Sequence, residues 1–171
     1  FTEFHKALEP QHIPGFNISY ADRYDTIYYV SNAKLPVRAK GYDWRKIVPG
    51  NTQKTLWKEF YTLKDMPQQL QPSSGYVYNT NHSPFISAGP ENHLDPDTFN
   101  ADMGFERFNN NRSARFQELM SGFNKVSYED FLSLKYDHQL PSKLEYTFMN
   151  IDALFKMDPA AYPKVASLVT R

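Results

Sequence analysis

The chain has 171 residues, the length of one domain that buries roughly 70% of the surface its unfolded state exposes. Its 19 basic and 19 acidic side chains cancel, so the sequence provides no strong field for binding nucleic acid or an anionic membrane. The absence of cysteine excludes disulfides and thiol catalysis. The sequence contains no run of about 18 apolar residues, so no membrane-spanning helix is predicted.

The N-terminal segment predicts the end of a helix followed by a β-hairpin. Apolar residues at helical spacing in residues 1–8 fit an amphipathic helix, which Pro10 stops. Residues 16–20 alternate as a strand, residues 21–25 carry turn chemistry, and residues 26–30 form the returning strand. The first residues lack the basic and apolar regions of a signal peptide, so none is predicted.

The middle of the chain predicts short strands between long connections. Proline and glycine divide residues 31–55 into loops, and the aromatic run at 56–62 predicts a strand. Residues 71–75 have turn chemistry and lead into a short predicted strand at 76–78. Residues 82–104 form a long excursion, and loops of that length in a compact domain are usually functional or contain unassigned structure.

The second part of the chain predicts four helices. Residues 105–120 have a helical pattern, and residues 127–130 resemble a capping box that opens a short helix to about residue 136. Pro141 opens a third helix, and Asp158 followed by proline opens a fourth. The third helix would present one apolar stripe, made of Leu144, Phe148, Ile151, Leu154 and Phe155.

This order of elements predicts the fold class. Strand-forming residues dominate positions 1–100, and helical patterns dominate positions 101–171. We therefore predict an α+β fold in one piece over residues 1–171, with antiparallel strands in the first half and helices in the second. The 12 Tyr, 13 Phe and 2 Trp suit a large rigid core, which is the commoner use, or a groove for apolar ligands.

Two asparagines follow the short predicted strand at 76–78. If the strand continued, Asn79 and Asn81 would point to the same face and could aim side-chain N–H donors at a ligand. The alternative is that asparagine simply suits turns and left-handed backbone at these positions. The pattern of residues alone favours this alternative.

Arg112 breaks the apolar pattern of the predicted helix at 105–120. It shares a helical face with Phe108, Phe116 and Leu119. A guanidinium on that face needs an anion, a carbonyl or water. It is either a structural arginine, paired with a carboxylate such as Glu118 or Asp130, or a fixed cation at the edge of a functional site.

Other chemistry is not supported by the sequence. The histidines show no metal-ligand spacing, Ser83 and Ser87 lack a nucleophile elbow, and no glycine-rich phosphate loop occurs among the 7 glycines. The histidines are His5, His12, His82, His93 and His138. We therefore predict no metal site in this chain.

Several motifs occur together in one order. They are ISYAD (18–22) and IYYV (27–30), VPG (48–50) and WK (57–58), PSSGYVYNTNHSP (72–84), NRSAR (111–115) with QELM (117–120), and VSYEDF (126–131). In this order they resemble the penicillin acylase (penicillin amidase) family of N-terminal-nucleophile hydrolases, which includes cephalosporin and acyl-homoserine-lactone acylases. The resemblance covers nearly all of residues 10–138, and the stretch 71–84 is its most specific part.

The resemblance implies an amide-hydrolase mechanism. In this family an autocatalytic cut frees a β chain that begins with serine, whose hydroxyl attacks an amide carbonyl and whose own α-amino group acts as the base. The resulting oxyanion is held by a backbone N–H and by the side-chain amide of an asparagine that matches Asn81. A supporting arginine matches Arg112, and His82, beside Asn81, would line the mouth of the substrate pocket.

The resemblance also implies a larger protein around this chain. Nothing in residues 1–15 matches the nucleophile segment, so we expect the serine upstream of Phe1 and read the chain as an interior, by itself inactive, fragment of the β chain. The whole protein would be a four-layer αββα sandwich in a periplasmic or secreted location. It would act on N-acyl compounds such as β-lactam antibiotics or acyl-homoserine lactones. Many members of the family also bind calcium. In this chain Asp95 and Asp97 are the acids considered for calcium, although solvated loop acids are the more common case.

A different class of function also fits the composition. The chain could be a non-catalytic, aromatic-rich binding or structural module that merely shares some turns with the family. The sequence upstream of Phe1 distinguishes the two, because only the hydrolase requires a serine there after a cleavable linker.

Overall fold

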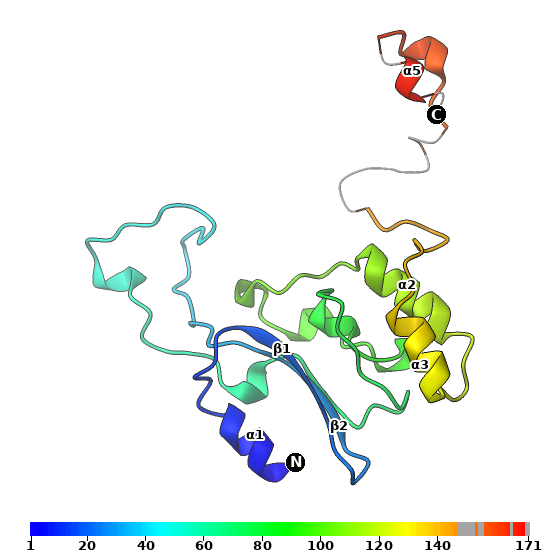
Figure 1. Ribbon diagram of the computed structural model, residues 1–171. Coiled ribbons are helices and arrows are strands. Elements are labelled where there is room, and N and C mark those ends of the chain that lie inside the picture. Colours follow the sequence, from blue (N-terminus) through cyan, green and yellow to red (C-terminus); the bar gives the residue numbers. More distant parts are fainter. Residues whose placement is uncertain (147–152, 154–155, 165, 170–171) are drawn as a thin grey trace. The chain divides into compact units, whose positions relative to one another are not determined.

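The structure, a computed structural model, describes residues 1–146, 153, 156–164 and 166–169. It forms two compact units, which are unit 1 (Phe1–Arg107) and unit 2 (Phe108–Arg171). All strands of the described residues lie in unit 1 (Figure 1). The combination of an antiparallel sheet with helices confirms the predicted α+β class. Every helix in the described part of the chain is too short or too polar to span a lipid bilayer.

Unit 1 is built on a three-stranded antiparallel sheet in the order β1-β2-β3. Strands β1 (Phe16–Ala21) and β2 (Ile27–Asn32) form the predicted hairpin, with Tyr20 opposite Tyr28. The carboxylate of Asp22 accepts hydrogen bonds from the backbone N–H groups of Tyr24 and Thr26, which closes the turn. Helix α1 (Thr2–Leu8) precedes the hairpin, so the first two predictions of the sequence are confirmed.

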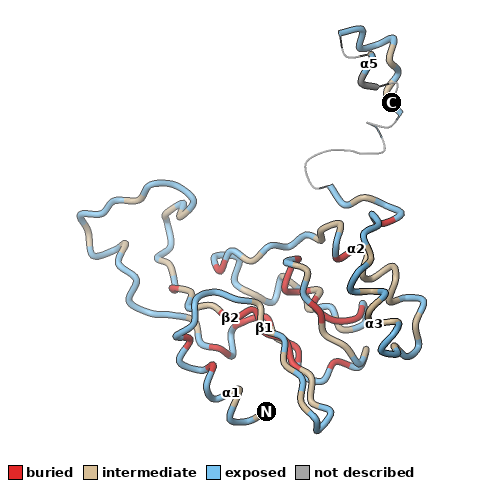
Figure 2. The backbone as a smooth tube through the Cα atoms, viewed as in Figure 1, coloured by how far each residue is buried: buried red, intermediate tan, exposed pale blue. Residues whose placement is uncertain are grey.

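The core lies against one face of the central strand β2. Figure 2 shows that buried positions concentrate along this strand. The fully buried apolar side chains of the core cluster are Leu8, Tyr28, Val30, Leu63, Met66 and Met103. Aromatic rings from α1 extend the cluster, because Phe4 stacks on Tyr20 with a centroid distance of 4.5 Å. Burial raises the pKa of Tyr28 to about 12, and its hydroxyl donates to Gln68.

The third strand, β3 (Gln68–Leu70), was not predicted from the sequence. Glutamine is a weak strand former, but β2 offers an unpaired edge, and the side-chain amides hold the segment there. The amide of Gln68 donates to the carbonyl of Leu63, and the amide of Gln69 donates to the carbonyl of Asn92. Tertiary hydrogen bonds therefore select this strand in place of local β propensity.

Two predicted strands are wrong. In residues 56–62 only Phe60 forms a bridge, with Pro36, and Leu56 and Trp57 are exposed. A strand needs burial on at least one face, and these side chains face solvent. In residues 76–78 only Val77 forms a bridge, with Ala88.

The long excursion at 82–104 contains structure that the sequence analysis left unassigned. It consists of short 3₁₀ helices, most of which begin with a proline that presets the backbone. They are η3 (Pro84–Ile86), η4 (Pro90–Asn92), η5 (Pro96–Thr98) and η6 (Ala101–Met103). Ser83 and Asp95 cap two of them through their side-chain oxygens. The excursion is therefore an ordered part of unit 1.

In unit 2, helix α2 (Asn111–Met120) begins six residues later than predicted. The side chain of Asn110 caps it by accepting the backbone N–H of Ser113, which stops the helix from extending toward Phe108. Phe108 therefore shares no helical face with Arg112, and Arg112 is exposed. The predicted face is therefore wrong for Phe108, whereas Phe116 and Leu119 lie on α2 together with Arg112.

The remaining helical predictions have mixed outcomes. Helix α3 (Tyr128–Lys135) begins with the predicted capping box, in which the Asp130 carboxylate accepts from the backbone N–H and hydroxyl of Ser127. The helix predicted from Pro141 is absent in residues 141–146, and the stripe residues after Leu144 lie outside the described residues. Asp158 caps a 3₁₀ turn, η7 (Pro159–Ala161), and the short helix α5 (Ala166–Val169) follows.

Candidate functional site

The candidate site is the loop 71–89 of unit 1, which contains both asparagines of the family motif. At its start, Gln71 has a left-handed backbone with φ of 49°. Its side-chain oxygen accepts the N–H of Ile27, and its amide donates to the carbonyl of Asp25. These two bonds fasten the beginning of the loop to the tip of the β1–β2 hairpin. The turn that follows closes through the N–H of Gly75 and the carbonyl of Pro72.

The two ends of the loop are tied to each other. The side-chain oxygen of Asn92 accepts the N–H of Ser74, and its amide donates to the hydroxyl of Ser73. The Ser74 hydroxyl in turn accepts the N–H of Gly89. A Cβ atom added at Gly89 would lie 2.5 Å from the Cβ of Ser74, so only glycine allows this close approach.

We expect Gly89→Ala to lower the free energy of unfolding by about 1–3 kcal/mol, because the added methyl group overpacks the contact with Ser74. Chemical denaturation of the purified protein measures this change. Gly50→Ala is the matched control, since an added Cβ there meets nothing within 4 Å. Equal stability of the two variants would contradict the proposed role of the close approach.

The asparagines of the motif form a turn and do not continue a strand. The side-chain oxygen of Asn79 accepts the backbone N–H of Asn81 at 2.9 Å, which is an Asx turn, and also the side-chain amide of Asn17 at 3.2 Å. Asn81 has φ of 56°, in the left-handed region, and is exposed. The interpretation that asparagine suits turns and left-handed backbone here is confirmed. Within this turn Asn79 is the organising acceptor, and Asn81 is held at the surface.

The residues after the turn anchor the loop in the interior. His82 is buried and stacks on the ring of Tyr78 at 4.4 Å between centroids, with 17° between the planes. Its Nδ1 accepts the backbone N–H of Thr80 at 3.1 Å, which places a ring proton on Nε2. The next residue, Ser83, is buried and donates its hydroxyl to the carbonyl of Glu106. An exposed Asn81 therefore stands directly beside two buried polar anchors.

The anchoring roles of His82 and Ser83 were not predicted from the sequence. His82 was predicted to line the mouth of the substrate pocket, whereas in the structure its buried ring supports the loop from inside. A substrate-binding role for His82 remains a prediction. Asn79 was considered as a donor, and its acceptor role could have been found from the Asn-x-Asn spacing, which is typical of an Asx turn. The contact of Ser83 with Glu106 is a long-range one, for which no sequence signal exists.

Arg112, the second predicted site residue, lies in unit 2 and is exposed in the first turn of α2. The carboxylates considered as its partners are bound by other groups. Glu118 pairs with Arg115 at 3.0 Å, and Asp130 caps Ser127. Asn81 and Arg112 thus belong to different compact units, each of which holds its residue at the surface.

Arg115 forms an ion-pair network that holds α2 to the segment after α3. Its guanidinium makes two bonds to the carboxylate of Asp137, at 2.9 and 3.0 Å, and one to Glu118. Glu118 also accepts the backbone N–H of Ser142 at 3.0 Å. The bonds to Arg115 lower the pKa of Asp137, and the bonds to Ser142 and Arg115 lower the pKa of Glu118. Arg115 is therefore a structural residue.

We expect Arg115→Gln to lower the melting temperature by about 5 °C at pH 7. Because the pKa values of Asp137 and Glu118 are lowered in the folded state, their contribution is fully present above about pH 5 and is lost as pH falls below about 4. The difference between the variant and the wild type should therefore shrink in acid. Thermal unfolding between pH 7 and pH 3 measures it, and a difference that grows in acid would contradict the network's role.

The two acids considered for calcium do not fit a cation site. The side chain of Asp95 accepts the backbone N–H of Asp97, and the carboxylate of Asp97 pairs with Arg107 at 2.6 Å. Because the guanidinium already neutralises this carboxylate, the two acids lack the charge that a calcium ion would require. Within the described residues no group of three or more His, Cys, Asp or Glu side chains could hold a metal ion.

Comparisons with known proteins point to one family. The family model described as penicillin amidase matches residues 1–158. The chain is also 41% identical over 68 residues to Penicillin G acylase from Escherichia coli, an alignment that covers 40% of this chain and 8% of that protein. The matched part is thus a small fraction of the length of this relative.

Proposed function

The chain belongs to the penicillin amidase family, and on that premise we propose that it supplies the supporting half of the active site of an amide hydrolase. The protein cleaves the linear amide bond of an N-acyl compound, such as a β-lactam antibiotic or an acyl-homoserine lactone. The nucleophile is an N-terminal serine in a part of the protein outside this chain, and the whole adopts the αββα sandwich. Family membership favours this function over a non-catalytic module.

In this proposal Asn81 stabilises the oxyanion. The attack of the serine hydroxyl on the amide carbonyl places a negative charge on the carbonyl oxygen, and fixed N–H donors lower the energy of that intermediate. The observation that carries the proposal is the geometry of the loop. Asn81 is exposed and held in a left-handed conformation by Asn79, while His82 and Ser83 anchor the loop beneath it. A backbone held in this way leaves only the side-chain torsions of Asn81 to be ordered when the charge develops.

Arg112 serves as the supporting cation in the proposed mechanism. A positive charge in the first turn of a helix opposes the helix dipole, so the position gives α2 no electrostatic benefit. Its charge instead favours the negative intermediate and supports the serine's α-amino group. The serine's α-amino group takes the hydroxyl proton and passes it to the leaving amine.

The proposal is tested by assaying the protein that contains this chain against a panel of N-acyl substrates. Release of the free amine from at least one β-lactam or acyl-homoserine lactone is the expected result, with the isolated 171-residue piece as the inactive control. Mass spectrometry of the mature protein should find a chain that begins with serine upstream of Phe1. We further propose a periplasmic or secreted location, which fractionation of the producing cells measures. An active protein without an N-terminal serine would overturn the mechanism.

A further inference from the structure

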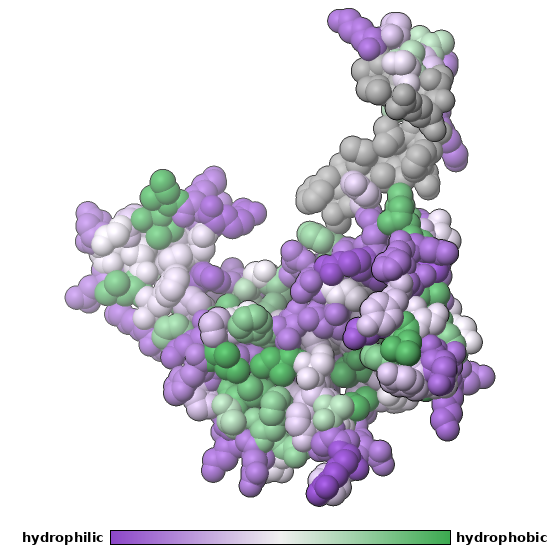
Figure 3. Space-filling model, in the orientation of Figure 1, coloured by the Kyte–Doolittle hydropathy of each residue, from purple (hydrophilic) through white to green (hydrophobic). Residues whose placement is uncertain are grey.

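Residues 37–60 form an arm that extends from the sheet of unit 1 and returns to it (Figure 1). The arm contains no α-helix or strand, and its only helical turn is η1 (Gln53–Thr55). Figure 3 shows hydrophilic side chains over much of this arm, with a few hydrophobic ones among them. The large side chains of Ile47, Leu56 and Trp57 in the arm are exposed. The arm carries six basic and two acidic side chains, although the whole chain has no net charge.

Two of these basic residues, Arg38 and Lys58, lie near the place where the arm leaves and rejoins the rest of unit 1. Pro36 bridges Phe60, and the backbone N–H of Val37 donates to the carbonyl of Glu59 at 2.9 Å. Extended by two residues in each segment, this antiparallel register would bring Arg38 opposite Lys58. Like charges directly opposite each other destabilise such a pair, so a compensating anion would be stabilising.

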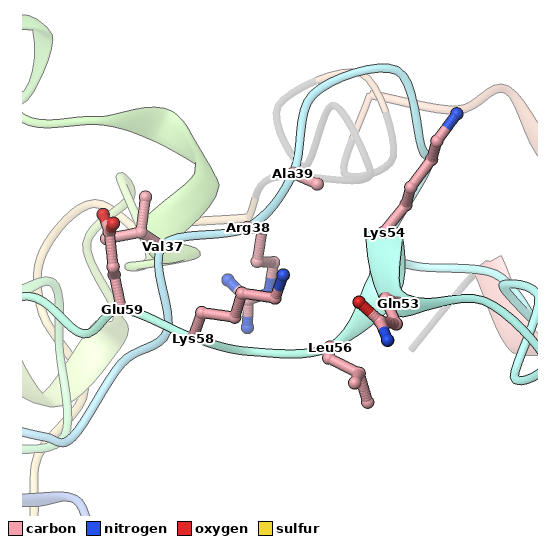
Figure 4. A pocket seen from close by; sticks show the side chains of 8 residues that line it. All are labelled: Val37, Arg38, Ala39, Gln53, Lys54, Leu56, Lys58 and Glu59. Atoms are coloured by element: carbon pink, nitrogen blue, oxygen red, sulfur yellow. The ribbon is translucent and has the colours of Figure 1, made fainter.

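The two charges share one cavity. A cavity of about 240 Å³ is lined by Arg38 and Lys58 together with Gln53 of η1. Figure 4 shows the side chains of Arg38 and Lys58 extending into the space between the two segments, which the side chain of Gln53 borders from η1. Local hydrogen bonds hold the turn that carries Gln53, because the N–H of Lys54 donates to the hydroxyl of Thr52 and the hydroxyl of Thr55 donates to the carbonyl of Pro49.

No carboxylate of the described residues lies within ion-pair distance of Arg38 or Lys58. The one acid that lines the cavity, Glu59, is directed away from both of them in Figure 4. The other acid of the arm, Asp43, is paired with Arg45. Arg38 donates one N–H to the carbonyl of Asp102, which positions the guanidinium and leaves its other donors available.

We propose that Arg38, Lys58 and the side-chain amide of Gln53 bind a small oxyanion, a carboxylate or a phosphate group, in this cavity. The guanidinium offers paired donors that match either group, the ammonium supplies a second charge, and the amide supplies a neutral donor. The bound anion relieves the repulsion between the two cations. This site lies apart from the Asn81 loop in the sequence and does not depend on the proposed hydrolase activity.

The test measures the melting temperature of the protein that contains this chain while inorganic phosphate, acetate or chloride is titrated at constant ionic strength. We expect a saturable rise with phosphate or acetate that chloride does not produce, because a ligand bound only to the folded state stabilises it. Calorimetric titration then gives the affinity. Tighter binding of phosphate assigns a phosphate ligand, and tighter binding of acetate assigns a carboxylate ligand.

Two lysine variants make the test specific. Lys58→Gln should weaken anion binding about tenfold, because one charged hydrogen bond to the anion is lost. In the absence of anion it should not lower the melting temperature, because it removes one of two like charges. Lys40→Gln is the matched control, because Lys40 is an exposed lysine of the same arm that does not line the cavity, and the affinity of this variant should stay within about twofold of wild type. Equal affinities for Lys58→Gln and wild type, or a response that chloride reproduces, would overturn the proposal.

Discussion

Asn81→Gly should lower kcat for amide hydrolysis by about 10²–10³-fold, because it removes one donor to the oxyanion. The glycine variant separates the loss of the amide from any change in the loop. Asn81 has φ of 56°, a conformation that glycine adopts without strain, so the substitution removes the amide and leaves the loop in place. Steady-state kinetics of the protein that contains this chain, together with thermal unfolding, measures both effects.

Two further variants separate chemistry from folding at this position. Asn81→Ala should lose the same turnover and also about 1 kcal/mol of stability, since alanine lacks the short polar side chain that lets asparagine tolerate the left-handed region. Asn124→Ala replaces an exposed asparagine of unit 2 and should keep wild-type turnover and stability. A turnover of Asn81→Gly within about threefold of wild type would remove Asn81 from the proposed oxyanion site.

Arg112→Gln should lower kcat/KM by about 10²-fold, because the fixed positive charge that supports the oxyanion is lost. Its free energy of unfolding should stay within about 0.5 kcal/mol of wild type, as is usual for exposed positions. Removal of a cation from the first turn of α2 also relieves an unfavourable interaction with the helix dipole. Kinetics and chemical denaturation of the same preparations measure the two quantities.

Arg115→Gln is the matched control on the same helix and should show the opposite pattern. It breaks the network with Asp137 and Glu118, so it lowers stability while turnover per folded molecule is retained.

The double variant Asn81→Gly with Arg112→Gln tests whether the two residues share a function. If both residues act on one intermediate, its loss of activity is smaller than the product of the single losses. Full additivity, or a stability loss from Arg112→Gln that matches that of Arg115→Gln, would argue for separate or structural roles.

The sequence by itself determined the elements whose stabilising interactions are local. The β1–β2 hairpin, helix α1 before Pro10 and the capping box at Ser127 were all predicted, because alternation, proline and capping act over a few residues. The family was also identified from the order of its motifs, and the match to residues 1–158 supports that identification. Asn79, Asn81 and Arg112 were singled out from local residue patterns, and the resemblance to the family then gave Asn81 and Arg112 their predicted roles.

The remaining features, β3, the start of α2 and the conformation of the loop around Asn81, depend on tertiary contacts or on a specific cap. β3 forms because the edge of β2 is open and two glutamine amides donate to backbone carbonyls. In the more apolar segment 56–62, by contrast, Leu56, Trp57 and Phe60 stay exposed. The start of α2 was set by the cap at Asn110. The loop around Asn81 was likewise fixed by Asn17 and Ser83, whose hydrogen bonds join positions far apart in the chain. Long-range burial and hydrogen bonding, which no local pattern encodes, thus determined how the site is held.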